Sequence, residues 1–425
     1  MAYEVARYGA GGGLGDAVMH VFWLSGMSCD GCSVAMLGAG NPAIEDLALD
    51  RVPELPIVVM HHPMISDESG HELMAAYAAA ADGSLGAPFM LVVEGSIPDD
   101  QALRAGHFAA MGSGSDWPRG VAAKRGLDQP IRVTDWIVAL APRAAASIAI
   151  GTCATWGGIP AAAGNITGSM GLMDFLGAQY RSARGIPVVN VPGCAPQGDN
   201  FTETLTEVMR HLAGQRELPP FDELGRPAWL FDQTVHRHCP KAGYYEEGVF
   251  ADEPGDNQCL VEIGCWGPVV QCNIVERSAI NHMGGCMVAG GACIGCTMPG
   301  FPDKYSPFYK APPGSAISGG VAKVTGGGIR RLRRMSMRNA NREPIWDRAH
   351  DPSTAWGAVH GSQNPLELIN ARFYKKLQYR GTVNHAERNK TQPQPKSMEI
   401  LRQKGIDMEA STDVLQEHLI TREEL

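Results

Sequence analysis

The sequence has no uninterrupted apolar run of the ~18 to 20 residues that a membrane-spanning helix requires. Its first residues, MAYEVARYGAGGGLGD, contain neither a charged segment followed by an apolar one nor a twin arginine. We therefore expect no export through a leader of its own. The expected location is the cytoplasm, with no membrane span of its own and at most a peripheral association with the membrane.

Nucleotide-binding and nucleic-acid-binding signatures are also missing. The glycine-rich segment Gly9–Gly15 has neither the dinucleotide-binding spacing nor the lysine of a phosphate loop, so we interpret it as a mobile N-terminal segment. Residues 301–425 carry 20 Lys and Arg against 13 Asp and Glu, but the whole chain has a net charge of −9. The densest basic patch, between Arg330 and Arg338, lacks interleaved aromatic residues. An acidic body opposes binding of a polyanion, so no nucleic-acid partner is expected.

Cysteine is absent from residues 1–28 and from residues 297–425, and all eleven cysteines lie between. They are grouped in sets of the size that a metal site uses. In a reducing compartment such sets favour metal over disulfides. Iron in clusters prefers tetrahedral thiolate coordination, so the grouping indicates iron–sulfur clusters and electron transfer.

Five short apolar, β-rich runs occur in the first two hundred residues, at 20–24, 57–60, 89–93, 148–150 and 188–191. Continuous apolar strands indicate burial on both faces of a sheet. Helical patterns intervene, for example at 70–81 and 134–141, which predicts an α/β fold with a flavodoxin-like, doubly wound parallel sheet. After the fifth run, Asn200 and Glu203 predict the start of a helix through a capping-box pattern.

Four cysteines follow the predicted strands directly: Cys29 and Cys32 the first, Cys153 the fourth and Cys194 the fifth. The carboxyl edge of an open parallel sheet is where ligands bind, so we expect these residues to converge there. Glu94 ends the third run at the same edge. It is interpreted as a neighbour of a cluster, as a proton relay, or as a carboxylate that caps its loop.

Between 236 and 296 the sequence loses regular periodicity and gains glycine and metal-ligand residues, which is typical of a loop-rich domain organised by metal. His236, Cys239, Cys259 and Cys265 form one set, with His238 as a bystander at the wrong spacing. A structural zinc site is the rival interpretation of this set, because three cysteines and one histidine commonly bind zinc. A second set, Cys272, Cys286, Cys293 and Cys296, follows at once and favours clusters.

Six motifs in this order resemble the small, electron-transferring subunit of nickel–iron hydrogenases over residues ~20 to 305: WLSGMSCDGCS (23–33), GTCATWGG (151–158), VPGC (191–194), His236-x-x-Cys239, GCWGP (264–268) and CIGC (293–296). The resemblance implies a proximal 4Fe-4S cluster held by Cys29, Cys32, Cys153 and Cys194, near a nickel–iron centre in a separate large subunit. It implies a distal 4Fe-4S cluster held by His236, Cys239, Cys259 and Cys265. A medial cluster would be held by Cys272, Cys293 and Cys296.

Two residues depart from the pattern of the family. Cys286 lies close to the position where many members have proline beside a 3Fe-4S medial cluster. We therefore predict a medial 4Fe-4S cluster with Cys286 as fourth ligand, the alternatives being a 3Fe-4S cluster and a spare thiol. Asp30 lies between two proximal ligands and is a candidate oxygen ligand, a hydrogen-bond acceptor or a solvated turn residue. The extra proximal cysteine pair of some oxygen-tolerant, membrane-bound members is absent.

The resulting organisation is an N-terminal segment (1–18), a flavodoxin-like domain (19–215), an iron–sulfur domain (216–305) and a partly helical C-terminal extension (306–425). Apolar helical faces at 365–380 and 412–425 indicate that the extension contacts a partner or another heterodimer. These features resemble the actinobacterial-type cytoplasmic uptake group. The expected function is hydrogen oxidation with a large-subunit partner, in a dimer of heterodimers or larger assembly, for an acceptor that the sequence does not identify. The alternatives are a complex-I-like iron–sulfur subunit, with one cluster, and a zinc-stabilised binding module.

Overall fold

The computed structural model describes residues 18–305, with gaps at 101–105, 119–127, 178, 223, 269 and 281–282, together with residues 308 and 324. The chain divides between Trp229 and Leu230 into two compact units. The glycine-rich N-terminal segment and the two apolar helical faces expected at 365–380 and 412–425 lie outside the described residues.

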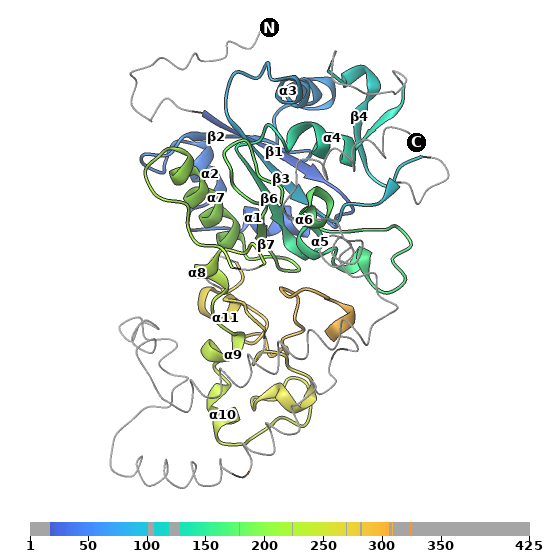
Figure 1. The fold of residues 1–425 in the computed structure, drawn as a ribbon. Helices are drawn as coiled ribbons and strands as arrows, with labels where there is room; N and C mark the ends of the chain where they lie inside the picture. Colours follow the sequence, from blue (N-terminus) through green and yellow to red (C-terminus); the bar gives the residue numbers. More distant parts are fainter. Residues whose placement is uncertain are drawn as a thin grey trace. The chain divides into compact units, whose positions relative to one another are not determined.

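The first unit is built on a five-stranded parallel sheet (Figure 1). Its strands are β1 (Val18–Ser25), β2 (Ile57–His61), β3 (Phe89–Glu94), β6 (Ala146–Ile150) and β7 (Val189–Val191), in the order β2-β1-β3-β6-β7. The first strand lies between the second and the third, and the order then runs outward to the last. This is the flavodoxin-like order, so the predicted fold is confirmed.

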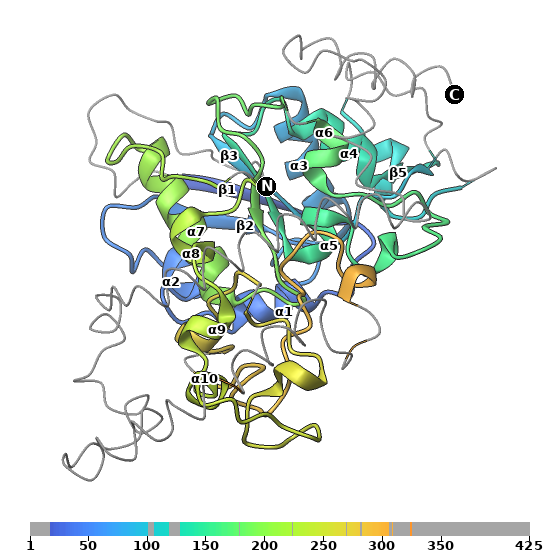
Figure 2. The same cartoon turned by 60° about the horizontal axis from the view of Figure 1, so that its bottom comes forward.

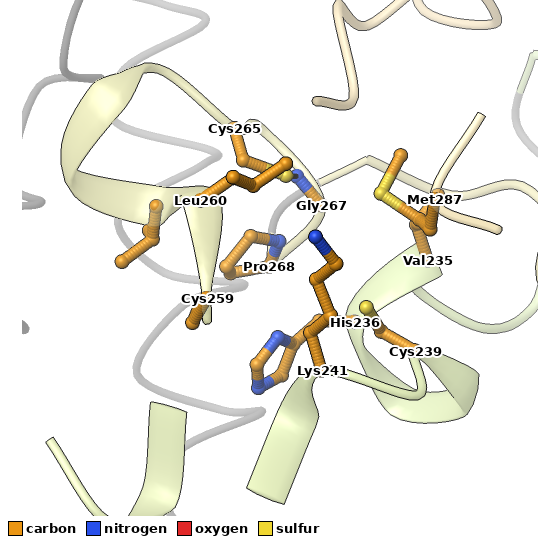
Figure 3. A pocket seen from close by; sticks show the side chains of 11 residues that line it. Val235, His236, Cys239, Lys241, Cys259, Leu260, Cys265, Gly267, Pro268 and Met287 are labelled. Atoms are coloured by element: carbon orange, nitrogen blue, oxygen red, sulfur yellow. Dashed lines mark hydrogen bonds between the residues drawn. The ribbon is translucent and has the colours of Figure 1, made fainter. Parts of the chain in front are cut away.

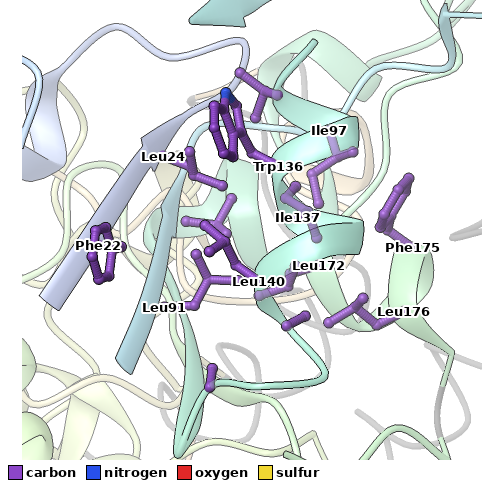
Figure 4. Close-up of a cluster of buried hydrophobic side chains, with 14 of the residues drawn as sticks. Phe22, Leu24, Leu91, Ile97, Trp136, Ile137, Leu140, Leu172, Phe175 and Leu176 are labelled. Carbon is purple, nitrogen blue, oxygen red and sulfur yellow. The ribbon is translucent and has the colours of Figure 1, made fainter. Parts of the chain in front are cut away.

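Helices cover both faces of this sheet, as Figure 2 shows from a second direction. The face that carries Val21, Trp23 and Val92 packs against α1 (Gly31–Leu37), α2 (Ile44–Ala48) and α7 (Gly198–Leu212). Alternate strand residues, Phe22 and Leu24 among them, pack on the other face against α3 (Gly70–Asp82), α4 (Val133–Leu140) and α6 (Leu172–Leu176), part of which Figure 4 shows. Because side chains alternate along a strand, burial on both faces requires the unbroken apolar runs of the sequence.

Smaller elements complete the first unit. Helix α5 (Gly151–Trp156) starts directly after β6, and the 3-10 helix η4 (Ile159–Ala161) follows it. The short strands β4 (Ala110–Ser113) and β5 (Pro130–Arg132) form a separate antiparallel pair, with the 3-10 helix η3 (Gly114–Asp116) between them.

The predicted start of the long helix after β7 is wrong. Helix α7 begins at Gly198, with Gln197 as its N-cap residue, so Asn200 lies inside the first turn. Glu203 does not cap the helix; it accepts a hydrogen bond from the Trp229 indole at 2.7 Å. The first turn of α7 packs closely on α1, because a Cβ at Gly198 would lie 2.2 Å from the carbonyl oxygen of Ala35, so this position requires glycine. Tertiary packing of this turn is not recorded in the local capping pattern.

The second unit is loop-rich, as expected. Its elements are short: α9 (Val235–His238), α10 (Ala242–Glu246), η5 (Leu260–Ile263), α11 (Ile274–Arg277) and η6 (Asp303–Tyr305), preceded by α8 (Ala228–Phe231) at the division between the units. Its small hydrophobic cluster includes the buried cysteines Cys265 and Cys293. Across the residues with described structure, no helix has the length and apolarity needed to cross a membrane.

Candidate metal centres

The first unit brings four cysteines together beyond the carboxyl ends of its strands. Cys29 and Cys32 follow β1, Cys153 lies in α5 after β6, and Cys194 follows β7. Burial raises the pKa of Cys32 far above its ordinary value, and the charges of Glu94 and of the other three thiols raise it further. Burial also raises the pKa of Cys153 to about 11. Thiols in this environment ionise only where a nearby cation compensates the charge, which is what bound iron supplies.

Glycine allows the backbone to approach these thiols closely. At Gly151, where φ is +83°, a Cβ would lie 2.3 Å from the Sγ atom of Cys32. At Gly158 a Cβ would lie 2.8 Å from the Sγ atom of Cys153. Gly151 and Gly158 of the GTCATWGG motif are therefore explained by the space that the cysteines occupy.

Glu94 is fully buried at this edge and accepts four hydrogen bonds. Its carboxylate receives the backbone N–H of Cys32 at 3.0 Å, the hydroxyl of Ser28 at 2.9 Å and the indole N–H of Trp23 at 3.0 Å. The hydroxyl of Ser33 is the fourth donor. Glu94 thus both neighbours the cysteine group and holds the loop that carries it, so two interpretations that the sequence left open apply together.

Asp30 occupies the left-handed conformation (φ 59°) at the N-cap position of α1. Its backbone N–H donates to the hydroxyl of Ser28 at 2.9 Å. This turn places the aspartate between Cys29 and Cys32 in the same loop, which Glu94 holds through Ser28.

In the second unit one pocket is lined by all four members of the set predicted for the distal cluster: His236, Cys239, Cys259 and Cys265 (Figure 3). Burial raises the pKa of Cys239 to about 11 and that of Cys259 to about 12. Burial lowers the pKa of His236 to about 4, which keeps the imidazole neutral, as a metal ligand must be. Backbone N–H groups of Gly267 and Cys293 donate to the Sγ atom of Cys265 at 3.4 and 3.3 Å.

The spacing of these donors does not fit one zinc ion. A single tetrahedral zinc holds its ligands at about 2.0 to 2.3 Å, which requires the donors to be tightly grouped. Among the residues that the structure describes, no three His, Cys, Asp or Glu side chains are grouped so as to hold one metal ion. Three thiols and one imidazole set around one pocket suit a polynuclear iron–sulfur group.

The four cysteines of the third set, Cys272, Cys286, Cys293 and Cys296, do not all act on one another. Burial raises the pKa of Cys293 well above its ordinary value, and the charges of Cys265, Cys296 and Cys272 contribute. Cys286 is exposed, and its charge acts on Cys265 of the pocket. The structure therefore brings Cys272, Cys293 and Cys296 together and places Cys286 within electrostatic reach of Cys265.

Two neighbours of the pocket complete the description. His238 is buried and its Nε2 atom lies 2.6 Å from Oε1 of Gln233, so it has a hydrogen-bond partner within the unit. Lys241 lines the pocket beside the four donors, a position that the sequence analysis missed. The signal for it was available, because this lysine follows Cys239 by two residues.

Comparisons with known proteins agree along the described chain. Residues 231–309 match the family model described as the C-terminal part of the NiFe/NiFeSe hydrogenase small subunit, and residues 29–208 match the one described as NADH ubiquinone oxidoreductase, 20 Kd subunit. The chain is 34% identical over 293 residues to the periplasmic [NiFeSe] hydrogenase small subunit of Desulfomicrobium baculatum, covering 68% of this chain and 87% of that protein. It is 30% identical over 356 residues to the F420 non-reducing hydrogenase II small subunit of Methanosarcina mazei, covering 75% and 85% of the two chains.

Solved structures give the same result. The actinobacterial-type NiFe-hydrogenase from Ralstonia eutropha H16 matches with a TM-score of 0.71 and 47% identity, over 78% of this chain and 93% of that chain. The [NiFeSe]-hydrogenase of Dm. baculatum matches with a TM-score of 0.59 and 33% identity, over 70% and 99%.

A parallel sheet with cysteines at its carboxyl edge, followed by a cysteine-lined second unit, defines an electron-transfer subunit of an oxidoreductase. The chain belongs to the family of nickel–iron hydrogenase small subunits, the electron-transfer partners of a large subunit. The two alternatives are not favoured: the complex-I-like interpretation leaves the matched segment 231–309 without a counterpart, and the donors do not fit a single zinc ion.

Proposed function

We propose that this chain relays electrons from hydrogen through three iron–sulfur clusters: a proximal 4Fe-4S cluster, a medial 4Fe-4S cluster and a distal 4Fe-4S cluster. The observation that carries the proposal is that the cysteines fall into separate groups. One group lies at the carboxyl edge of the sheet, and another lines the pocket of the second unit together with His236. Soft thiolate donors fit iron in such clusters. When bound, the clusters accept and release single electrons. The nickel–iron centre would be on the partner large subunit.

The proposed ligands fall into the three predicted sets. The proximal set is Cys29, Cys32, Cys153 and Cys194; the medial set is Cys272, Cys286, Cys293 and Cys296; the distal set is His236, Cys239, Cys259 and Cys265. In this arrangement Glu94 holds the proximal loop in place through Ser28 and the Cys32 amide. A neutral His236 in place of a fourth thiolate lowers the negative charge of the distal set, which favours acceptance of an electron there.

The test is metal content with activity. This chain should carry about twelve iron atoms with sulfide, in line with three four-iron clusters, so its complex with the large subunit, whose nickel–iron centre adds one iron, should contain about thirteen. The complex should also reduce a dye when hydrogen is supplied. Zinc in place of iron, or one cluster without hydrogen oxidation, would contradict the proposal.

Cys286 decides the type of the medial cluster. We propose it as fourth ligand because it lies seven residues before Cys293 in the sequence. Paramagnetic resonance of the oxidised complex should then show no strong three-iron signal, and the Cys286→Ser variant should gain one. A strong three-iron signal in the unaltered protein, with about eleven iron atoms on this chain and so about twelve in the complex, would make Cys286 a spare thiol.

Asp30 can be tested separately at the proximal site. If its carboxylate binds iron in some state of the cluster, Asp30→Ala will change the redox and spectroscopic behaviour of the proximal cluster. Unchanged behaviour would leave Asp30 as a turn residue, in keeping with its left-handed conformation.

We further propose a cytoplasmic location and a dimer of heterodimers or a larger assembly. The location is supported by the resemblance to the actinobacterial-type group, since an actinobacterial-type NiFe-hydrogenase matches this chain at 47% identity. Fractionation of the native cells against marker proteins tests the location, and the mass of the purified complex tests the assembly. Recovery with periplasmic markers, or the mass of one heterodimer, would contradict the respective proposal.

A further inference from the structure

Lys241 is a cation inside the pocket of the proposed distal site. It follows Cys239 by two residues, at the N-cap position of α10, and lines the same pocket as the four donors. Figure 3 shows its side chain among the labelled donors. Its Nζ atom donates a hydrogen bond to the backbone carbonyl oxygen of Asp256, which fixes the ammonium in place.

The charge of Lys241 acts on three of the four donors. Burial is the largest influence on the thiols of Cys239, Cys259 and Cys265 and raises the pKa of each, whereas Lys241 opposes the rise in all three. The proximal group lies beside a negative charge instead of a positive one, because there the charge of Glu94 adds to the rise in pKa for Cys32 and Cys153. The two sites thus differ in the sign of the fixed charge beside them.

This difference has a redox consequence. A cluster becomes more negative by one charge when it accepts an electron, so a fixed cation nearby stabilises the reduced form more than the oxidised form. Exclusion of water from a buried site reduces screening of that interaction. The same reasoning gives a carboxylate the opposite effect.

We propose that Lys241 raises the reduction potential of the cluster held by His236, Cys239, Cys259 and Cys265, and so directs electrons toward this end of the chain. The inference rests on the proposed distal cluster and deepens it. The rival role is purely structural, since the bond to Asp256 also joins the start of α10 to the loop that precedes Cys259.

The experiment is a potentiometric titration of the distal cluster, followed by paramagnetic resonance, in the purified complex of both subunits. Lys241→Gln and Lys241→Met remove the charge, and the glutamine retains a donor for the Asp256 carbonyl. Lys241→Arg keeps the charge. Arg237→Gln is the matched control, because it removes an exposed cation that does not line the pocket.

Lys241→Gln should lower the midpoint potential, so that the ratio of reduced to oxidised cluster at fixed potential falls about tenfold, or about 59 mV for a one-electron couple. Lys241→Arg and Arg237→Gln should titrate as the unaltered protein does. An intact distal cluster with an unchanged midpoint in Lys241→Gln would overturn the inference. Loss of the cluster in both neutral variants, with retention in Lys241→Arg, would also overturn it, because the charge would then be required to hold the cluster and not to set its potential. Absence of a distal cluster from the unaltered complex would instead refute the proposed function.

Discussion

The contact between Gly151 and Cys32 provides a direct test of how the sheet edge makes room for its thiols. In Gly151→Ala the new methyl carbon would lie 2.3 Å from the Sγ atom of Cys32, and the residue would keep a φ of +83°. A side chain in left-handed conformation costs about 1–2 kcal/mol, and overpacking of a buried site costs about 1–3 kcal/mol more. The total loss of stability is therefore about 2–5 kcal/mol, with displacement of the Cys32 thiol.

Gly185→Ala separates these two contributions. Gly185 has a similar φ of +78°, but a Cβ there meets no atom within 4 Å. This variant should lose only about 1–2 kcal/mol and should keep its full iron content. Urea unfolding followed by the fluorescence of the buried tryptophans, together with iron analysis, measures both effects. Equal stability and equal iron content in the two variants would refute the steric argument.

Other predictions concern the packing and the pH response of the same unit. Tyr77→Phe removes a buried hydroxyl that donates to the carbonyl oxygens of Trp23 and His61 at 2.6 and 2.7 Å, so urea unfolding should show a loss of about 1–3 kcal/mol; an unchanged midpoint would contradict this. Burial lowers the pKa of His62 from its ordinary 6.5 to about 4. As the pH falls, His62 therefore takes up a proton in the unfolded chain at a higher pH than in the folded chain. The free energy of unfolding should be level above pH 6.5 and fall as the pH drops from 6.5 toward 4. In His62→Gln the fall should be smaller, and an equally steep fall would exclude His62 as its source.

The sheet was predictable because its strands are buried on both faces. Each of the five apolar runs falls within or next to an observed strand, and the helices expected at 70–81 and 134–141 correspond to α3 and α4. The antiparallel pair β4–β5 was not predicted, since its strands are short and partly exposed and so lack a strong pattern. The start of α7 was misplaced because its first turn, at Gly198, packs closely on Ala35 of α1, and no local pattern records such a contact.

The surroundings of the candidate sites were less predictable than their cysteines. Cysteine spacing and position after strands identified groups that the structure brings together at one edge and in one pocket. The partners of Glu94 come from the end of β1 and the start of α1, so its four hydrogen bonds depend on the pairing of β1 with β3. The position of Lys241 in the pocket likewise depends on how the loop near Asp256 folds back.

The two units differ in what their interiors are made of. The first contains large hydrophobic clusters on both faces of its sheet, whereas the described core of the second is small and counts Cys265 and Cys293 among its members. Where metal coordination contributes to the interior, the free energy of metal binding becomes free energy of folding. We therefore expect iron supply to act as a quality-control checkpoint during maturation. In iron-starved cells, proteases should cleave the chain first beyond Leu230 and leave the sheet unit as a resistant fragment.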